Sequence, residues 1–360
     1  MVAQTGVQFL VHSGGMTDYA LHYARQAAQV LPGFTTVLIA DRQVTSIPNG
    51  VVVAPMSDLV SKAQMRELRE RVEAAGFPHS FRGGYWLRVF SRFLAIRSYI
   101  EERAPTGPCL QIETDVASFL SHEVVGVTLD GKSGRALVPM HDDVSACPSI
   151  ILAPTGESLA SAMTLVVDRL GERFGQSDMA LLGRAVMEGR LGALPTTPLS
   201  GAPDIGVRRI AGSSISTEVE SARLVFDAAA IGQYLFGIDP RNNQGVLIPG
   251  YRELRGGIDP GMWDDWHLAV GSDNVVRVAA RCDDKLMVFA ILHVHAKLCV
   301  PAPVPENAAW QEWLSVANHQ RGATATVLPL VYVRTRMEKA RQLAGVARGR
   351  LRSGRGAKGV

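Results

Sequence analysis

Cys-Leu-Gln-Ile-Glu-Thr-Asp-Val, residues 109–116, is an apolar run that stops at two carboxylates, Glu113 and Asp115. Side chains at the carboxyl end of a strand in an open α/β sheet reach the crevice where ligands bind. Two acids one residue apart can hold a divalent ion directly and through water, and they leave positions open for phosphate oxygens. We therefore expect a strand here with a metal site at its end. The open alternative is a solvated turn.

His-Val-His-Ala-Lys, residues 293–297, ends a strongly β-prone run over 286–292 and supplies the second half of the expected site. Successive strand residues point to opposite faces, so His293, His295 and Lys297 would share a polar, solvated face opposite an apolar back. Two imidazoles that can bind a metal, beside an ammonium that can hold phosphate, indicate one rim of a metal–diphosphate site. The alternative is an amphipathic edge strand with solvated histidines.

The first 60 residues have an alternating β-α-β-β pattern, with strands over 6–11, 34–40 and 50–54 and a helix over 18–30. This start favours a doubly wound α/β fold. The loop Ser13-Gly14-Gly15 would let a nucleotide approach the backbone, because glycine tolerates conformations that other residues resist. It has neither the spacing of a dinucleotide fingerprint nor that of a P-loop.

Further elements follow from apolar periodicity and turn residues. Helices are expected over 62–75, 85–103 and 156–174, and a strand over 149–153. A hairpin is expected from 124–129 and 136–138 around Asp130-Gly131. Residues 187–205 are rich in glycine and proline, and they predict a loop that is either a lid, an acceptor-binding insertion or a plain connection.

Several segments resemble glycosyltransferases of the GT-A type, which use nucleotide-diphosphate sugars. Residues 90–97 and 112–116 are similar to the family's arginine-bearing helix and D-x-D strand, and residues 293–297 to its H-x-H-[SA]-K element. Segments 177–182 and 226–240 also resemble bacterial and viral members. The resemblance implies a GT-A-like catalytic domain over 1–305, with a mixed, mostly parallel central sheet flanked by helices, and a C-terminal helical segment over 306–360.

The resemblance also implies roles for individual residues. Asp115 and His295 would hold Mn²⁺ or Mg²⁺, and imidazole favours Mn²⁺. Glu113 stands where the family has its first aspartate, so Asp115 is favoured as the direct ligand, and Glu113 would either bind the ion too or contact ribose or a metal-bound water. The candidate metal ligands are Asp115, Glu113, His295 and His293. The residues expected to contact the donor are Ser13, Arg92, Glu113, Asp115, Gln233 and Lys297.

Some of these roles have structural alternatives. Arg92 would point towards the nucleotide and the acidic motif, or form a surface ion pair with an acidic residue. Gln233 and Asp239 would contact the donor sugar or stabilise the turn at 237–240. Asp178 and Asp227 are the candidates for a catalytic base that deprotonates the acceptor, but helix capping explains each of them without chemistry.

Aromatic residues offer one further candidate site. Trp263, Trp266 and His267 would form a platform for the acceptor sugar, because sugar faces stack on aromatic rings. The alternative is that they are partly buried core, which is the commoner fate of tryptophan.

Composition sets the broad class of the protein. With 360 residues, 47% hydrophobic and 20% charged, the chain can bury one large α/β core or two modest lobes. No apolar run approaches the ~20 residues of a membrane helix, and the short apolar segment after Met1 predicts a first strand rather than a signal peptide, so we expect a cytoplasmic protein. Four cysteines without C-x-x-C spacing predict buried free thiols.

Charge is unevenly distributed. The net charge is +3, yet residues 334–360 hold nine Lys/Arg and one acid, so the rest of the chain carries −5. We expect a helix that frays into a disordered, solubilising tail. A second interpretation is contact with anionic lipid at the cytoplasmic face of the membrane, near a lipid-linked acceptor. Nucleic acid is the least favoured partner, and no specific nucleic acid is expected.

Function therefore has one leading hypothesis and two alternatives. The leading hypothesis is transfer of a sugar from a nucleotide-diphosphate sugar, with a UDP-sugar as the family default, to a glycan or lipid-linked acceptor. The alternatives are a metal-dependent nucleotidyltransferase and a catalytically inert nucleotide- or carbohydrate-binding module. The sequence identifies neither the sugar nor the acceptor, and it leaves open whether the anomeric configuration is retained or inverted.

Overall fold

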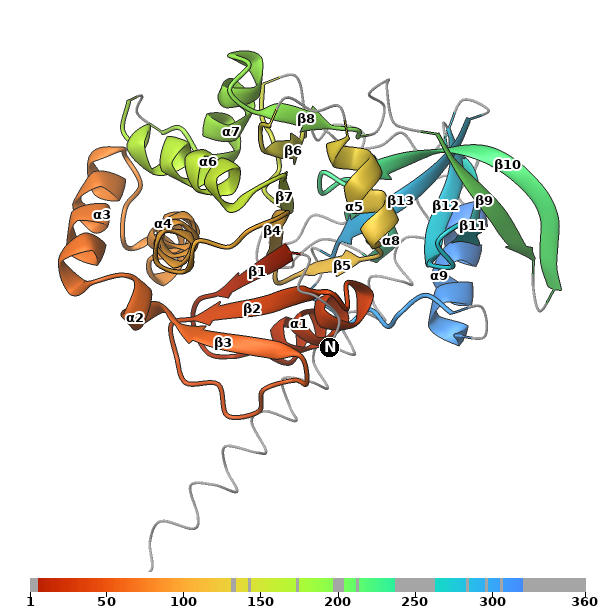
Figure 1. The fold of residues 1–360 in the computed structure, drawn as a ribbon, viewed down its shortest axis with the longest axis horizontal. Coiled ribbons are helices and arrows are strands. Elements are labelled where there is room, and N and C mark those ends of the chain that lie inside the picture. Colours follow the sequence, from red (N-terminus) through yellow and green to blue (C-terminus); the bar gives the residue numbers. More distant parts are fainter. Residues whose placement is uncertain are drawn as a thin grey trace, which may run out of the picture.

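Two β-sheets form the framework of the chain (Figure 1). The computed structural model describes residues 6–130, 134–141, 144–172, 175–196, 204–211, 214–236, 263–282, 285–294, 297–304 and 307–319. The first sheet has the strand order β3-β2-β1-β4-β7-β6-β8. Its strands are β1 (Gly6–His12), β2 (Phe34–Ala40), β3 (Val51–Pro55), β4 (Cys109–Glu113), β6 (Leu137–Pro139), β7 (Ile150–Ala153) and β8 (Gly192–Leu194).

The first sheet is largely parallel. Strands β3, β2, β1 and β4 run in the same direction, β7 is antiparallel to both β4 and β6, and β6 is parallel to β8. Helices cover one face: α2 (Met56–Leu59), α3 (Lys62–Ala74), α4 (Tyr85–Arg103), α6 (Gly156–Asp168) and α7 (Asp178–Met187). On the other face lie α1 (Asp18–Val30) and α5 (His122–Leu129). The predicted mixed, mostly parallel sheet flanked by helices is confirmed.

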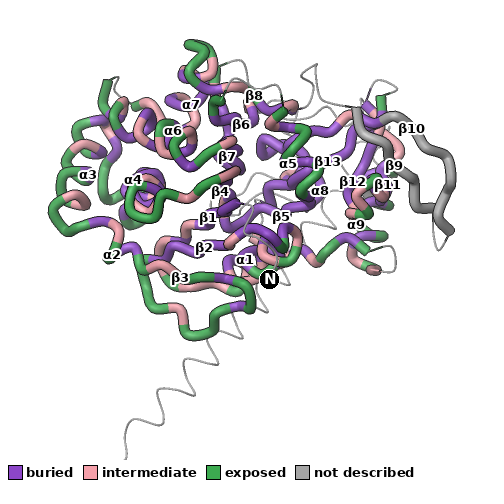
Figure 2. The backbone as a smooth tube through the Cα atoms, in the orientation of Figure 1, coloured by how far each residue is buried: buried purple, intermediate pink, exposed green. Residues whose placement is uncertain are grey.

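Local sequence explains these helices. In α4 the side chains of Leu87, Phe90 and Leu94 recur at helical spacing and are buried against the sheet. Ser61 and Gln64 form a reciprocal capping box at the start of α3, so the backbone N–H groups there find partners. Buried residues accordingly concentrate in the strands and on the inner sides of the helices (Figure 2).

The second sheet has the strand order β10-β9-β11-β12-β13-β5, and the carboxyl end of β10 also pairs with β13. Its strands are β5 (Val116–Ser118), β9 (Asp204–Ala211), β10 (Ser214–Phe226), β11 (Trp263–Gly271), β12 (Val276–Cys282) and β13 (Lys285–His293). Helices α8 (Ile231–Phe236) and α9 (Ala308–His319) pack on it. Trp310 of α9 is fully buried, with its ring against Phe119 and Phe236.

The predicted hairpin over 124–129 is wrong, because these residues belong to α5. The hydroxyl of Ser121 accepts a hydrogen bond from the N–H of Val124 and caps the helix, while Glu123 lies in its first turn. Val124 and Val125 are buried between the two sheets. A short β-branched run fits a strand or a buried helix equally well, and here the cap and the packing favour the helix.

The boundaries of other predicted elements differ less from those in the structure. The helix predicted over 156–174 ends at Asp168, and the loop predicted over 187–205 contains β8. Cys109, Cys147 and Cys282 are buried and free, as expected, whereas Cys299 is half-buried and lies outside any strand. In the described residues, no helix is long and apolar enough to cross a membrane. The basic segment 334–360 lies outside the described residues.

A buried ion pair links the second sheet to the start of α5. Arg277 of β12 is 1% exposed and donates to Asp273 and to the backbone oxygen of Phe119. Asp273 also accepts from the hydroxyl of Ser121, the residue that caps α5. Burial alone would raise the pKa of Asp273, but its hydrogen bonds with Arg277 and Ser121 hold that pKa below its usual value.

We expect Asp273→Asn to lower the free energy of unfolding by about 3 kcal/mol at pH 7, because it leaves the charge of Arg277 buried and unpaired. A carboxyl with a depressed pKa stabilises the fold above its unfolded pKa of about 3.9, and this contribution is lost as the pH falls through the folded pKa. Urea denaturation should therefore show a difference that shrinks as the pH falls below about 3.9. A loss of stability that does not change with pH would contradict the ion pair, and exposed Asp168→Asn is the control.

Candidate functional site

The backbone brings the two sequence motifs together at the junction of the sheets. Strand β4 ends at Glu113 and β5 begins at Val116, so Asp115 lies in the turn that links the first sheet to the second. Strand β13 pairs antiparallel with β5 and places His293 opposite Val116. The N–H of Val294 donates to the backbone oxygen of Asp115 at 2.7 Å. This register makes residues that are distant in sequence neighbours in space.

The side chains converge as well. His293 Nε2 lies 3.2 Å from Asp115 Oδ2 and 3.4 Å from Glu113 Oε2. Lys297 Nζ forms an ion pair with Asp115 Oδ2. Asp115 and His293 are buried, while Glu113 and Lys297 are partly exposed. An acidic pair and a His/Lys pair therefore share one site, as the sequence predicts.

The prediction that the strand continues through Lys297 is wrong, although His293 and Lys297 both lie beside Asp115. Strand β13 ends at His293, and Lys297 has a φ of 56° with its N–H bonded to the oxygen of Val294. The chain thus turns after the strand, and this turn brings Lys297 to Asp115. His293 is only 6% exposed, so the predicted solvated face is wrong for this residue. His295 lies outside the described residues.

Arg92 of α4 binds two carboxylates, one from β4 and one from α7. Its Nη1 pairs with Glu113 Oε1, and its Nη2 lies 2.5 Å from Asp178 Oδ2. Burial would raise the pKa of Glu113, but the charge of Arg92 lowers it to about 2. Burial dominates at Asp178 and raises the pKa of that carboxyl despite Arg92. The predicted orientation of Arg92 towards the acidic motif is confirmed, and its ion pairs are buried.

Both candidate catalytic bases serve as helix caps or ion-pair partners. Asp227 is 1% exposed and accepts hydrogen bonds from the N–H groups of Ala230, Ile231, Gly232 and His293. Asp178 follows Ser177, whose hydroxyl caps α7. The carboxylate of Asp178 forms an ion pair with Arg92. These contacts favour the structural interpretation, and a role as base stays a prediction for both.

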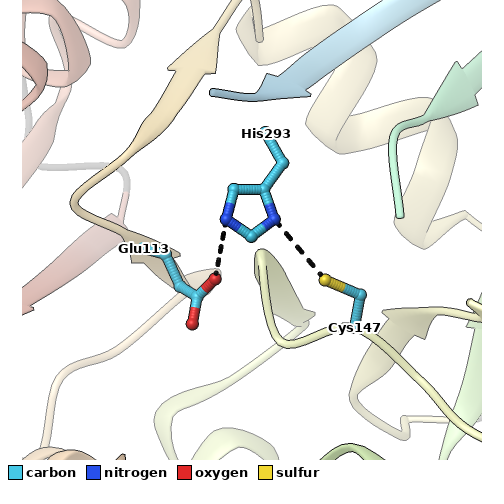
Figure 3. Close-up of side chains that lie close together, drawn as sticks. All are labelled: Glu113, Cys147 and His293. Atoms are coloured by element: carbon cyan, nitrogen blue, oxygen red, sulfur yellow. Dashed lines mark hydrogen bonds and ion pairs between the residues drawn. The ribbon is translucent and has the colours of Figure 1, made fainter. Parts of the chain in front are cut away.

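Cys147 is a neighbour that sequence analysis did not assign to the site. Its Sγ lies 3.7 Å from His293 Nδ1, and the imidazole stands between this sulfur and Glu113 (Figure 3). Burial would lower the pKa of His293, but the contact with Cys147 and the charges of Glu113 and Asp227 raise it to about 9. Because the two ring nitrogens point in opposite directions, an ion held on Nε2 would also reach the carboxylates and would leave Cys147 to orient the ring.

The site opens into a cleft of about 510 Å³. Ser13, Gly14 and Gly15 line it, as predicted, together with Arg92, Glu113, Asp115, His293 and Lys297. The N–H of Gly14 donates to both carboxylate oxygens of Asp41, which fixes the loop. A Cβ added at Gly14 or Gly15 would meet no atom within 4 Å, so a ligand can approach this backbone closely.

Two other predicted contacts, Gln233 and the aromatic platform, are absent from the described residues that line the cleft. Gln233 lies in α8. Trp263, Trp266 and His267 are buried at 3%, 2% and 7% exposure, and Trp266 stacks on both Trp263 and Phe289. The predicted acceptor platform is therefore wrong, and the core alternative is confirmed. Asp239 lies outside the described residues.

Gln111 and Tyr19 are among the residues of the cleft that sequence analysis did not assign to the site. Gln111 shares one face of β4 with Glu113, and its Nε2 donates to the oxygen of Pro148, so strand alternation was a usable signal. Tyr19 lies beneath Lys297, with 5.9 Å between Nζ and the ring centroid. Neither Tyr19 nor Cys147 has a local sequence signal, because only the fold brings them to the site.

No protein-family model and no curated protein matches the sequence. Among solved structures, the PaToxG glycosyltransferase is similar over 52% of this chain and 69% of that chain, with 9% identity and a TM-score of 0.33. Mouse xyloside xylosyltransferase 1 is similar over 52% and 84%, with 12% identity and a TM-score of 0.35. The glycosyltransferase GlyE of Streptococcus pneumoniae is similar over 53% and 45%, with 11% identity and a TM-score of 0.31. These similarities are too distant to assign a function.

We expect Arg92→Met to lower the free energy of unfolding by about 3 kcal/mol, because it leaves the buried Asp178 and the partly buried Glu113 without their cation. Combining it with Asp178→Asn should cost less than the sum of the two single changes. Urea denaturation of the four proteins measures this coupling. Arg103→Met, in an exposed ion pair with Glu102, is the control and should change little. Additive losses would show that Arg92 and Asp178 do not stabilise each other.

Proposed function

We propose that the chain is a metal-dependent glycosyltransferase that takes a sugar from a nucleotide-diphosphate sugar, with a UDP-sugar preferred, and transfers it to a glycan or lipid-linked acceptor. The observation that carries this proposal is the meeting of Asp115, Glu113, His293, Lys297 and Arg92 at one open cleft. Carboxylates, an imidazole and cations at one place suit a diphosphate with its divalent ion.

The donor set fits Mn²⁺ or Mg²⁺. Asp115 and His293 would hold the ion, with Glu113 next to it, and the imidazole favours Mn²⁺ because Mg²⁺ prefers oxygen ligands. A bound ion would offset the negative charge that develops on the departing nucleoside diphosphate. His293 must lose a proton from Nε2 to act as a ligand. His295 stays a further candidate.

The chain's own residues supply the rest of the electrostatic stabilisation. Lys297, now paired with Asp115, would donate to a phosphate oxygen of the leaving group. Arg92 keeps Glu113 ionised at neutral pH, so the site retains its negative charge. The Ser13 loop, held by Asp41, would receive the nucleoside.

Location and acceptor follow as part of the same proposal. We place the enzyme in the cytoplasm, with the basic segment 334–360 in peripheral contact with anionic lipid at the inner membrane face. A lipid-linked acceptor would be presented at that surface. No specific nucleic acid is involved.

We expect UDP with Mn²⁺ to raise the thermal midpoint of the full chain, because a ligand that binds the folded state stabilises it by mass action. The same measurement with GDP and CDP, each with and without Mn²⁺, identifies the nucleotide base that the site prefers. Asp115→Asn should abolish the Mn²⁺-dependent part of the shift, while the exposed control Asp168→Asn keeps it. No shift with any nucleotide would favour the inert module.

We expect Lys297→Gln to weaken UDP binding about tenfold while binding still requires Mn²⁺, because the change removes a phosphate contact and leaves the metal ligands. Calorimetric titration of UDP with and without Mn²⁺ measures the affinity for UDP and its dependence on the ion. Unchanged affinity would show that Lys297 serves only to neutralise Asp115.

A further inference from the structure

A second hollow of about 510 Å³ lies at the opposite edge of the first sheet from the cleft that contains Glu113 and Asp115. Residues 134–136 and 189–191 line it and directly precede the parallel strands β6 and β8, and α6 forms another wall. Because β6 runs parallel to β4, the hollow lies where β4 begins, whereas the cleft lies where β4 ends. We call it the α6 groove. Its volume is within the range of roughly 300–1,000 Å³ that is typical of small-molecule sites.

Hydrogen bonds fix the two loops that form the groove. Gly189 lies just past the end of α7 with a φ of 70°, and the N–H of Arg190 donates back into α7 at 2.9 Å. Arg135 donates from Nη1 to the backbone oxygen of Gly189, which ties one loop to the other. The hydroxyl of Ser158 on α6 donates to the backbone oxygen of Gly134 at 2.6 Å. The polar side chains of the groove therefore stand on a backbone that these bonds hold in place.

The α6 groove has an excess of positive charge. Arg135 and Arg190 are exposed and line it. In the described part of the chain, no carboxylate oxygen lies within 4.0 Å of either guanidinium group. Glu188, the acid nearest to Arg190 in sequence, forms ion pairs with two other arginines. Glu157, in the first turn of α6, also lines the groove, so two arginines against one glutamate leave a net charge of +1.

The lining combines groups that suit two parts of one ligand. Guanidinium groups bind phosphate through paired, charge-assisted hydrogen bonds. A carboxylate only accepts hydrogen bonds, and the hydroxyl groups of a sugar can donate them. Ser158 and Ser161 lie about one turn apart on α6 and add two hydroxyls near Glu157. A bare anion would be repelled by Glu157, whereas a phosphate attached to a hydroxyl-rich ring gives this carboxylate donors.

We propose that the α6 groove binds a phosphate attached to a hydroxyl-rich ring, either a free sugar phosphate or an inositol phosphate at the head of a lipid. Arg135 and Arg190 hold the phosphate, and Glu157 accepts hydrogen bonds from the ring hydroxyls. The described residues that line the groove differ from those that line the cleft at Asp115, so the two sites fill independently. The inference does not rest on the proposed function, because it involves no metal ion, nucleotide or transfer step.

The test compares ligands that carry one or both parts of this chemistry. Glucose 6-phosphate, inorganic phosphate and glucose are titrated into the full chain by ligand-observed proton and phosphorus NMR. Arg190→Met removes a cation at an exposed position, so the variant should fold with an unchanged thermal midpoint. Arg190→Lys keeps the charge, and Glu157→Ala removes the acceptor. Arg66→Met, at an exposed arginine of α3, is the control.

We expect glucose 6-phosphate to bind about tenfold more tightly than either inorganic phosphate or glucose. Arg190→Met should weaken its binding about tenfold, whereas Arg190→Lys should lose less and Arg66→Met nothing. Glu157→Ala should remove the preference over inorganic phosphate, because the bare anion is no longer repelled and the sugar loses its acceptor.

The source of the ligand is distinguished with vesicles of phosphatidylcholine that contain or lack phosphatidylinositol 4-phosphate. If Arg190→Met co-sediments less than the unchanged chain with the phosphorylated vesicles, the ligand is a lipid headgroup. Equal co-sedimentation identifies the free sugar phosphate. The basic segment 334–360 is the same in both proteins, so its own attraction to lipid cancels in this comparison.

The proposal is wrong if glucose 6-phosphate does not bind, if glucose or inorganic phosphate binds as tightly, or if Arg190→Met keeps the full affinity. An equal loss in Arg66→Met would reveal a general effect of charge and would also contradict it. Failure of the proposed function is distinguishable, because these titrations contain neither nucleotide nor Mn²⁺.

Discussion

Carboxylates buried at the junction of two sheets need positive partners, and this requirement organises the site. Glu113 and Asp115 stand where β4 ends, and Asp178 faces them from α7. Arg92 forms ion pairs with Glu113 and Asp178, and Lys297 forms one with Asp115. A buried charge without a partner costs several kcal/mol, so α4, α7, β4 and the segment after β13 are held together by these pairs. In the proposed function, one of these cations would give way to a divalent ion.

The position of His293 depends on a second constraint, which is the close packing of α8 on the end of β13. Asp227 accepts hydrogen bonds from four backbone N–H groups, three at the start of α8 and one of His293. A Cβ at Gly232 would lie 2.1 Å from the backbone oxygen of His293, so only glycine allows this approach. The imidazole is therefore fixed by the backbone as well as by Cys147, and it is presented to the carboxylates with little freedom.

Much of the architecture was predictable because the signals were local. The β-α-β-β start, the helix over 85–103 and the strand ending at Glu113 follow from periodicity and composition. The helix at 122–129 was missed because a short β-branched run has no decisive period, and its Ser121 cap outweighed the turn signal after it. Glu113, Asp115, His293 and Lys297 could be predicted to lie together because each short motif carries a local sequence signal and the two motifs suit one site. Cys147 and Tyr19 could not be predicted, since only tertiary contacts bring them to the site.

In the proposed function, Asp115 and His293 bind one metal ion beside a nucleoside diphosphate. The most direct measurement is anomalous diffraction at the manganese edge from crystals of the full chain grown with Mn²⁺ and UDP. We expect a single strong peak in contact with Asp115 Oδ2 and His293 Nε2, with the diphosphate between that peak and Lys297. A peak elsewhere, or UDP bound without a peak between these side chains, would contradict it.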